Sequence, residues 1–298
     1  MESCNAPPRL VQRMAAFFEL CKPRVNSLIV FTAMIGMWLA APDMARPGRF
    51  LLASLGIALV AGGAAAINCL VERTSDALMT RTRARATARG DISTIETLTL
   101  ATLMGGVGLW LLHAWVNDLT MWMTLATFVG YAIIYTVVLK PMTPMNIVIG
   151  GAAGAMPPVL GWAAMTGQVT SQSLALFLII FLWTPPHFWS LACYRREEFA
   201  RAGLPMLPVI RGVAHTCRHS LFYVVALTGA SFLPVALGMA GAAYGIVVAA
   251  LDVLFIVQSY QLCRNYSDAS ARWMFRYSIT YLTVLFAVLL ADHLLLTT

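Results

Sequence analysis

The chain has 298 residues, of which 59% are hydrophobic and only 11% are charged. Soluble domains usually carry about 25% charged residues, so this composition excludes an ordinary soluble protein and indicates an integral membrane protein. The formal net charge of +7 follows from how basic residues are placed around a membrane, and it gives no reason to expect a nucleic-acid partner.

Nine apolar segments follow one another, each close to the roughly 20 residues that a helix needs to cross a bilayer. They are apolar around the whole circumference, and no alternating strand pattern of a membrane barrel is present. We therefore predict an all-α polytopic membrane protein, with a cytoplasmic segment at residues 1–24 and one transmembrane domain at residues 25–298. The predicted spans are residues 25–41, 50–70, 97–115, 119–139, 145–165, 173–194, 219–240, 242–262 and 273–296.

The basic residues predict the orientation. All 20 Lys and Arg residues except Arg46 and Arg49 fall on one side of the nine spans, and positively charged loops stay in the cytoplasm. This places the N-terminus in the cytoplasm and the C-terminus in the periplasm. A polar leader that contains Glu19 and ends in Lys22-Pro23-Arg24 favours a retained first helix over a signal peptide. The absence of a transit-peptide pattern favours the bacterial plasma (inner) membrane.

Cysteine spacing shows no metal-binding pattern, so we expect free thiols and no structural metal. The six cysteines, all in or beside segments assigned to the cytoplasm, are Cys4, Cys21, Cys69, Cys193, Cys217 and Cys263.

Two long polar loops, at about residues 71–96 and 195–218, lie on the predicted cytoplasmic side, where a site is expected. In the first, Asn68, Glu72 and Asp76 follow at steps of four residues. Each step turns a helix by about 400°, so the three side chains share one face. Such oxygen ligands suit Mg²⁺, which commonly bridges to substrate phosphates, and the following arginines Arg81 and Arg85 can clamp phosphate oxygens.

Alternatives remain open for these residues. Glu72 and Asp76 would form surface ion pairs with Arg73 and Arg81 if they are only interfacial residues. Lys140, at the end of the fourth span, pairs with a phosphate or extends its ammonium group to the membrane surface.

The sixth span contains Pro185-Pro186-His187. Paired prolines remove helix hydrogen bonds, which predicts a broken helix that lines a cavity. Three roles remain open for His187: it binds or stacks on a porphyrin, it transfers a proton, or it only forms a hydrogen bond with a neighbouring helix. The stretch from Gly150 to Pro158 permits close helix approach and a kink. Asp252 is ionisable at membrane depth, but a hydrogen-bonded packing role is equally consistent, and we leave it out of the site.

These motifs resemble those of the protohaem IX farnesyltransferase branch of the UbiA-type intramembrane prenyltransferase superfamily, over nearly the whole chain. The first motif is typical of the superfamily, whereas Trp-x-x-Pro-His-Phe and Pro-Met-Leu-Pro point to the haem branch. The matching segments include Lys22-Pro23-Arg24, Asn68 to Arg85, Tyr135-Thr136, Leu139-Lys140, Asn146 to Trp162, Trp183 to Ala192, Pro205 to Pro208 and Ala271 to Leu282.

The resemblance implies nine helices around a central cavity, Mg²⁺ as cofactor, and farnesyl diphosphate and haem b as substrates. A downstream haem A synthase or terminal oxidase would receive the product, and the lipid bilayer is the other partner. The candidate catalytic residues are Asn68, Glu72, Asp76, Lys140 and Glu198, and all of these except Lys140 are also the candidate metal ligands. The candidate diphosphate-binding residues are Arg24, Arg81, Arg85, Lys140 and Arg195, and those for haem or the prenyl chain are Tyr135, Trp183, His187 and Tyr194.

The chain departs from the family pattern at several positions. The family usually has Arg-Pro where this chain has Arg85-Ala86, and a basic residue where this chain has Pro141. It usually has Asp-Tyr where this chain has Glu198-Phe199. Ala202 replaces the second acid of the later motif, so two symmetric pairs of aspartates are not expected. Two competing functions remain. A quinone- or lipid-directed prenyltransferase would share the first motif, but the Trp183 to Phe188 segment argues against it. A transporter would also have many membrane helices, but the inverted repeat that is typical of transporters is not apparent in the sequence.

Overall fold

Apolar helices make up the structure, a computed structural model that describes residues 10–41 and 47–297. Within these two ranges there is no strand, and nine helical stretches are long and apolar enough to cross a membrane. The all-α fold and the number of spans are therefore confirmed for the described residues. Arg9, Arg46 and Cys4 lie outside them. The nine stretches are Pro23–Ala40, Pro47–Val71, Thr94–Trp115, Asp118–Met142, Asn146–Thr166, Ser171–Tyr194, Val213–Ala236, Ala242–Arg264 and Asp268–Leu296.

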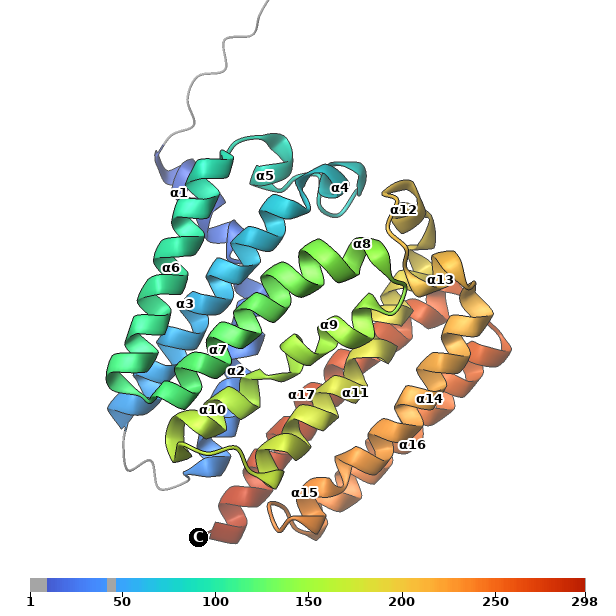
Figure 1. The fold of residues 1–298 in the computed structure, drawn as a ribbon. Coiled ribbons are helices and arrows are strands. Elements are labelled where there is room, and N and C mark those ends of the chain that lie inside the picture. Colours follow the sequence, from blue (N-terminus) through green and yellow to red (C-terminus); the bar gives the residue numbers. More distant parts are fainter. Residues whose placement is uncertain (1–9, 42–46, 298) are drawn as a thin grey trace, which may run out of the picture.

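Several stretches consist of more than one helix, and short helices occupy the loops between them (Figure 1). In chain order the elements are α1 (Leu10–Leu20), α2 (Pro23–Ala40), α3 (Pro47–Val71), α4 (Arg73–Leu78), α5 (Ala86–Arg89), α6 (Thr94–Trp115), α7 (Asp118–Val129), the π-helix η1 (Gly130–Leu139), α8 (Lys140–Met142), α9 (Asn146–Ala155), α10 (Pro157–Thr166), α11 (Ser171–Tyr194), α12 (Arg196–Arg201), α13 (Leu207–Ile210), α14 (Val213–Ser231), α15 (Leu233–Ala236), α16 (Ala242–Arg264) and α17 (Asp268–Thr297).

Proline acts differently in two of these spans. The fifth span divides at Met156 into α9 and α10, and Pro157 opens the second helix, where its missing N–H costs nothing. The predicted kink is confirmed there. By contrast, α11 runs without interruption from Ser171 to Tyr194 through Pro185 and Pro186, so the predicted break is wrong. Neighbouring helices α9, α14 and α17 pack along α11, and this packing outweighs the two missing backbone bonds.

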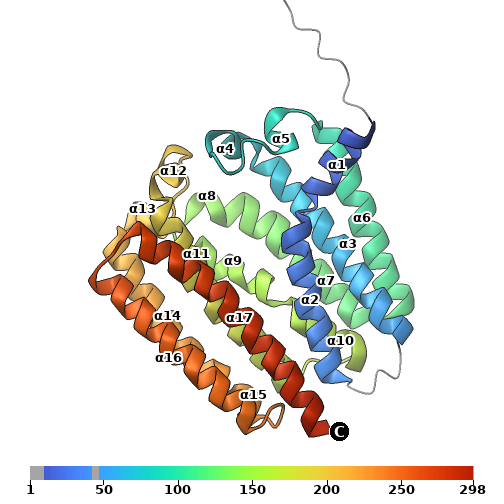
Figure 2. The ribbon, with the colours of Figure 1, turned by 180° about the vertical axis from the view of Figure 1, so that it is seen from behind.

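The helices form two groups (Figures 1 and 2). One group contains α2, α3, α6, α7 and α10, in which α3 packs against α6 and α2 against α10. The other contains α11, α14, α16 and α17, each packed against its neighbours, with Tyr244, Phe255 and Tyr281 fully buried between them. Helix α9 lies between the groups, in contact with both η1 and α11.

Two glycines bring α2 and α10 unusually close. A Cβ atom on Gly161 would lie 1.9 Å from the carbonyl oxygen of Ala33, and one on Gly36 would lie 2.2 Å from the carbonyl oxygen of Pro158. Only glycine fits at either position, as expected for small residues between membrane helices.

The two long loops lie at the same end of the bundle (Figure 1), with α4 and α5 in the first and α12 and α13 in the second. The second loop is shorter than predicted because α14 begins at Val213. Beneath the loops, buried side chains from both form one apolar cluster that includes Met79, Trp189, Phe199 and Met206. The loops are thus anchored side by side over the same end of the helices.

Candidate active site

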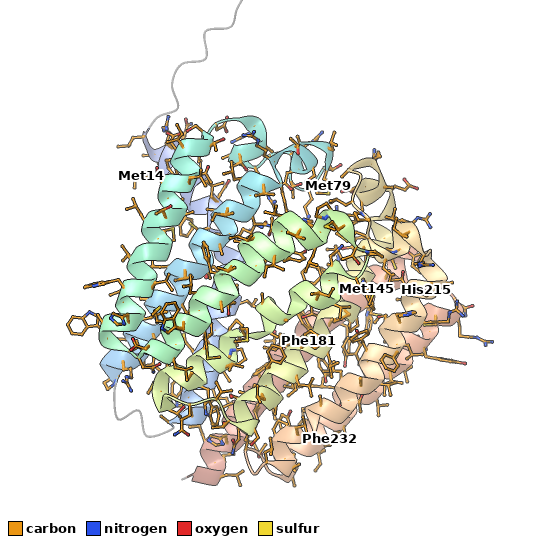
Figure 3. All side chains as sticks on the ribbon, viewed as in Figure 1. Met14, Met79, Met145, Phe181, His215 and Phe232 are labelled. Carbon is orange, nitrogen blue, oxygen red and sulfur yellow. The ribbon has the colours of Figure 1, made fainter. Side chains whose placement is uncertain are left out.

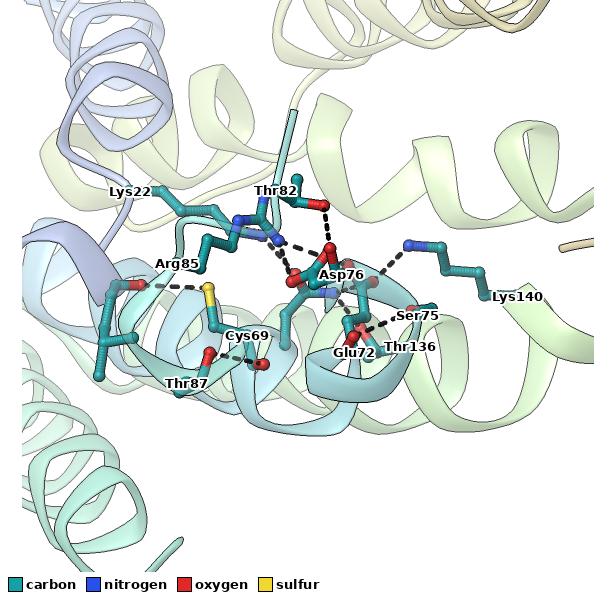
Figure 4. A network of polar contacts seen from close by, with 12 residues as sticks. Lys22, Cys69, Glu72, Ser75, Asp76, Thr82, Arg85, Thr87, Thr136 and Lys140 are labelled. Atoms are coloured by element: carbon teal, nitrogen blue, oxygen red, sulfur yellow. Dashed lines mark hydrogen bonds and ion pairs between the residues drawn. The ribbon is translucent and has the colours of Figure 1, made fainter. Parts of the chain in front are cut away.

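The side chains of Asn68, Glu72 and Asp76 lie together where α3 ends and α4 begins, and Figure 4 shows Glu72 and Asp76 within one network of polar contacts. The helical path continues into α4, because the Glu72 N–H donates to the Asn68 carbonyl at 3.0 Å and the Asp76 N–H donates to the Glu72 carbonyl at 2.8 Å. This repeat of four residues sets the side chains on one face, as the spacing predicted. All three are buried, with Asp76 completely inaccessible.

Basic residues from distant segments neutralise the two carboxylates. Lys140 Nζ donates to Glu72 Oε1 at 2.5 Å, and Arg85 Nη1 lies 2.5 Å from Asp76 Oδ2 and 3.8 Å from Glu72 Oε2. The Lys140 side chain is only 12% exposed. It therefore points into the protein, and the alternative of an ammonium group extended to the membrane surface is wrong.

The alternative in which Glu72 and Asp76 pair with Arg73 and Arg81 is also wrong. Arg73 donates to the hydroxyl of Thr94 at 3.1 Å and not to either carboxylate. Arg81 forms no ion pair with another described residue.

Lys22 is a site residue that the sequence analysis did not assign. It lies between α1 and α2 with φ 47° and ψ 62°, a left-handed conformation that costs a residue with a side chain about 1–2 kcal/mol. Its Nζ donates to the side-chain oxygen of Asn68. The rarity of lysine in this chain was the one signal that could have pointed to it. Strain of this kind persists where the surrounding structure enforces it, often at functional sites.

The charges at the site influence one another. Burial by itself would raise the pKa of Glu72, but Lys140 and Lys22 outweigh it and hold the pKa below its ordinary value. Burial lowers the pKa of Lys22, with partial compensation by Glu72. Desolvation also lowers the pKa of Arg81, and the positive charges of Arg85 and Arg195 lower it further. Arg195 belongs to the second loop, so cations of both loops act on the same region.

The fourth span completes the first motif from the side. Asn68 Nδ2 donates to Glu72 Oε1 at 2.6 Å and to Thr136 Oγ1 at 3.0 Å. Thr136 lies in η1, and π-helical turns frequently occur at functional sites. In the same helix Tyr135 stacks on Tyr131, with 5.7 Å between ring centroids. The Tyr135 ring covers Gly150, where a Cβ atom would lie 2.0 Å away.

The second loop does not place its acid among the first three residues. Glu198 on α12 accepts from Arg195 Nη1, at 3.1 and 3.3 Å from its two oxygens. Among the described residues no three acids, histidines or cysteines form a group that could hold a metal. Arg24 is exposed on α2. The metal role of Glu198 and the diphosphate role of Arg24 therefore stay predictions.

Aromatic rings surround His187 where α11 packs against α17. The imidazole stacks between Trp183, at 4.3 Å, and Phe275, at 4.6 Å between centroids. Its Nδ1 lies 2.7 Å from Ser278 Oγ, and Trp183 Nε1 donates to the Ser278 carbonyl. Of the three roles left open for His187, the bond to a neighbouring helix is present. At the loop end of α11, the guanidinium groups of Arg195 and Arg272 each lie over the Tyr194 ring, at 5.6 and 5.7 Å from its centroid.

Asp252 has the packing role considered for it. Its two oxygens accept from Ser231 Oγ and from Tyr281 Oη, both at 2.7 Å. The carboxyl group therefore joins α14, α16 and α17 far from the loops.

Residues 29–287 match the family model described as the UbiA prenyltransferase family. The chain belongs to this family. It is accordingly a membrane-spanning enzyme, a prenyltransferase, and not a transporter.

Several relatives of this UbiA prenyltransferase carry the same name. A protein of Dechloromonas aromatica, "Protoheme IX farnesyltransferase", is 68% identical over 286 residues, with 96% of each chain covered. A protein of Azoarcus sp. with that name is 58% identical over 287 residues, again with 96% of each chain covered.

Solved structures share the fold at low sequence identity. The structure of a digeranylgeranylglyceryl phosphate synthase has a TM-score of 0.81 at 18% identity and covers 95% of this chain and 99% of that chain. A UbiA homologue from Archaeoglobus fulgidus bound to GPP and Mg²⁺ has a TM-score of 0.59 at 17% identity, with 92% and 99% covered. At such identities the likeness establishes the UbiA fold and nothing further.

The first motif of this UbiA prenyltransferase has the donors that a hard divalent cation prefers. Asp76 Oδ1 is buried and has no hydrogen-bond partner among the residues that the structure describes, although a buried carboxylate oxygen normally has one. Glu72 Oε2 lies 3.8 Å from Arg85 Nη1, which is beyond hydrogen-bond distance. Two carboxylates and the amide of Asn68 are too few ligands for a closed site, as suits a metal that shares its coordination with water and a diphosphate.

Proposed function

We propose that this enzyme transfers the farnesyl group of farnesyl diphosphate to a vinyl group of protohaem IX, with addition of water, to give haem O and diphosphate. The observation that carries the proposal is the 68% identity to a protein named protoheme IX farnesyltransferase over 96% of both chains. The cluster of buried carboxylates and cations at the loop end of the bundle supports it independently of the name.

Mg²⁺ is the proposed cofactor, with Asn68, Glu72, Asp76 and, from the second loop, Glu198 as ligands. When bound, it would neutralise charge that develops on the leaving diphosphate. The unpartnered Asp76 Oδ1 and the chemistry of this donor set support the assignment.

The basic residues of the chain have a proposed role in releasing the diphosphate. Lys140 and Arg85 now pair with Glu72 and Asp76, and a bound cation would take over the neutralisation of these carboxylates. Their N–H groups would then be available for phosphate oxygens, together with Arg24, Arg81 and Arg195. Preorganised donors aimed at developing charge are usually the largest contribution to catalysis.

The last proposed step is the transfer of the farnesyl group to haem. As the allylic C–O bond breaks, its electron pair leaves with the diphosphate, and the vinyl group of haem attacks the farnesyl carbon. Water adds to the resulting cation, and its proton passes to the diphosphate. Tyr135, Trp183, His187 and Tyr194 are the proposed walls of the central cavity, where apolar surroundings keep water from the farnesyl carbon before the attack.

The proposed location is the bacterial plasma membrane, with the N-terminus and both long loops in the cytoplasm and the C-terminus in the periplasm. The distribution of lysine and arginine supports this orientation. The product would pass to a haem A synthase or to terminal oxidase assembly.

The decisive experiment combines purified enzyme in nanodiscs with haem b, farnesyl diphosphate and Mg²⁺. We expect haem O in the mass spectrum and an equal amount of diphosphate. Prenylation of a hydroxybenzoate or naphthoate, with no product from haem, would refute the haem assignment and leave the family assignment intact.

A second experiment tests the metal motif. Asp76→Asn keeps the shape of the side chain but removes a metal ligand, so we expect turnover to be abolished at every Mg²⁺ concentration, with the helical circular dichroism unchanged. Wild-type turnover in this variant would contradict the metal role of Asp76.

A further inference from the structure

The outer face at the start of α14 carries two histidines that none of the proposed chemistry uses. His215 and His219 are four residues apart and therefore neighbours on the helix surface, with 4.1 Å between ring centroids. Both are partly accessible. Figure 3 shows the side chain of His215 at the loop end of the helix.

His219 is oriented as metal-ligating histidines are. Its Nδ1 lies 3.0 Å from the backbone carbonyl oxygen of His215, and a carbonyl only accepts, so Nδ1 carries the proton. In the neutral ring the lone pair is then on Nε2. Ligating histidines almost always donate their other ring N–H to a carbonyl or carboxylate in this way. Trp189, which is completely buried, packs edge to face against the same ring and limits its rotation.

The surroundings favour an anionic, flat ligand over a bare cation. Arg211 and Arg218 lie within electrostatic range of His215, and neither forms an ion pair with another described residue. Positive charges repel a free divalent ion but attract carboxylates, which guanidinium groups bind bidentately. Phe222, seven residues or about two helical turns beyond His215, is 69% exposed and offers an apolar surface on the same side of the helix.

We propose that this face of α14 is a docking site for haem, in which His219 Nε2 ligates the iron while Arg211 and Arg218 hold the propionates. The site is separate from His187 and receives the acceptor before it reaches the cavity. It rests on the proposed function, because haem is the acceptor there. The two axial positions of a porphyrin iron lie on opposite sides of the ring, so His215 and His219 cannot both bind one iron, and His215 is the dispensable member.

The test is a titration of ferric haem b into the enzyme in nanodiscs, without farnesyl diphosphate or Mg²⁺. We expect an imidazole-ligated Soret spectrum that H219Q loses, with binding weakened roughly tenfold or more. H215Q should bind within about threefold of wild type, and H113Q, at an exposed histidine outside this face, should bind as wild type does. Binding of metal-free protoporphyrin IX should not depend on His219.

Two results would overturn the proposal. One is an unchanged spectrum in H219Q. The other is an equal loss in H215Q and H219Q together with tight Zn²⁺ binding that needs both residues, because that would make the pair a chelate for a free metal ion.

Turnover measured in parallel separates this site from the proposed function. Haem O formation without a spectrum that depends on His219 refutes the docking site alone. An intact spectrum with no haem O formed by the wild type refutes the proposed function alone.

Discussion

Replacement of Lys22 by methionine removes one half-buried positive charge from the candidate active site and keeps a side chain of similar length. Its Nζ donates to Asn68, and its charge also lowers the pKa of Glu72. A hydrogen bond with a charged donor contributes about 1.5–3 kcal/mol, and a tenfold change in rate corresponds to about 1.4 kcal/mol. We therefore expect K22M to lower turnover roughly 10- to 100-fold.

The assay is release of diphosphate together with haem O formation, measured across pH. Without Lys22 the pKa of Glu72 rises, because one of the charges that lower it is gone, so the acidic limb of the pH profile should move to higher pH. R83M is the matched control, since Arg83 is an exposed arginine of the first long loop and should leave turnover within about twofold.

Lys22→Gly separates catalysis from folding. Both variants lose the bond to Asn68, but glycine adopts the left-handed conformation at position 22 without the penalty of about 1–2 kcal/mol. The thermal midpoint of K22G should therefore fall less than that of K22M, whereas turnover should fall equally in both. Wild-type turnover and an unmoved pH profile in both variants would refute the role assigned to Lys22.

Three further predictions concern the carboxylates and the packing of the bundle. The pKa of Glu72 is lower in the folded protein, so its ionised carboxylate contributes stability above about pH 4.5. This contribution is lost as the pH falls through the lowered pKa. E72Q should therefore flatten the acidic part of a plot of unfolding midpoint against pH, and an unchanged plot would contradict the pairing with Lys140. Gly161→Ala should destabilise the protein by about 1–3 kcal/mol through overpacking, as measured by thermal unfolding. Gly154→Ala is the control, because a Cβ atom at that position meets nothing within 4 Å and should not destabilise the protein. Equal effects of the two substitutions would disprove the close approach of α2 and α10. Asp252→Asn should retain turnover while lowering the thermal midpoint, and loss of turnover in a folded variant would move Asp252 into the site.

The sequence by itself determined the features that depend on local pattern. Long runs of apolar residues specify membrane helices because the bilayer leaves backbone groups no other partner, and the nine spans follow from this. The shared face of Asn68, Glu72 and Asp76 follows from helix geometry alone. The kink at Pro157 follows from the missing N–H of proline.

Only the tertiary structure decided which residues meet across the chain. Lys22 and Lys140 approach the first motif from different spans, and no spacing in the sequence relates them to Glu72. For the same reason Arg73 and Arg81, which are near in sequence, were the partners in the ion-pair alternative, whereas the fold supplies Lys140 and Arg85. The continuity of α11 through Pro185 and Pro186 likewise depends on the helices that pack along it, which no local pattern in the sequence reveals. Local rules describe the backbone, whereas ion pairs and helix continuity depend on neighbours that the fold brings from far along the chain.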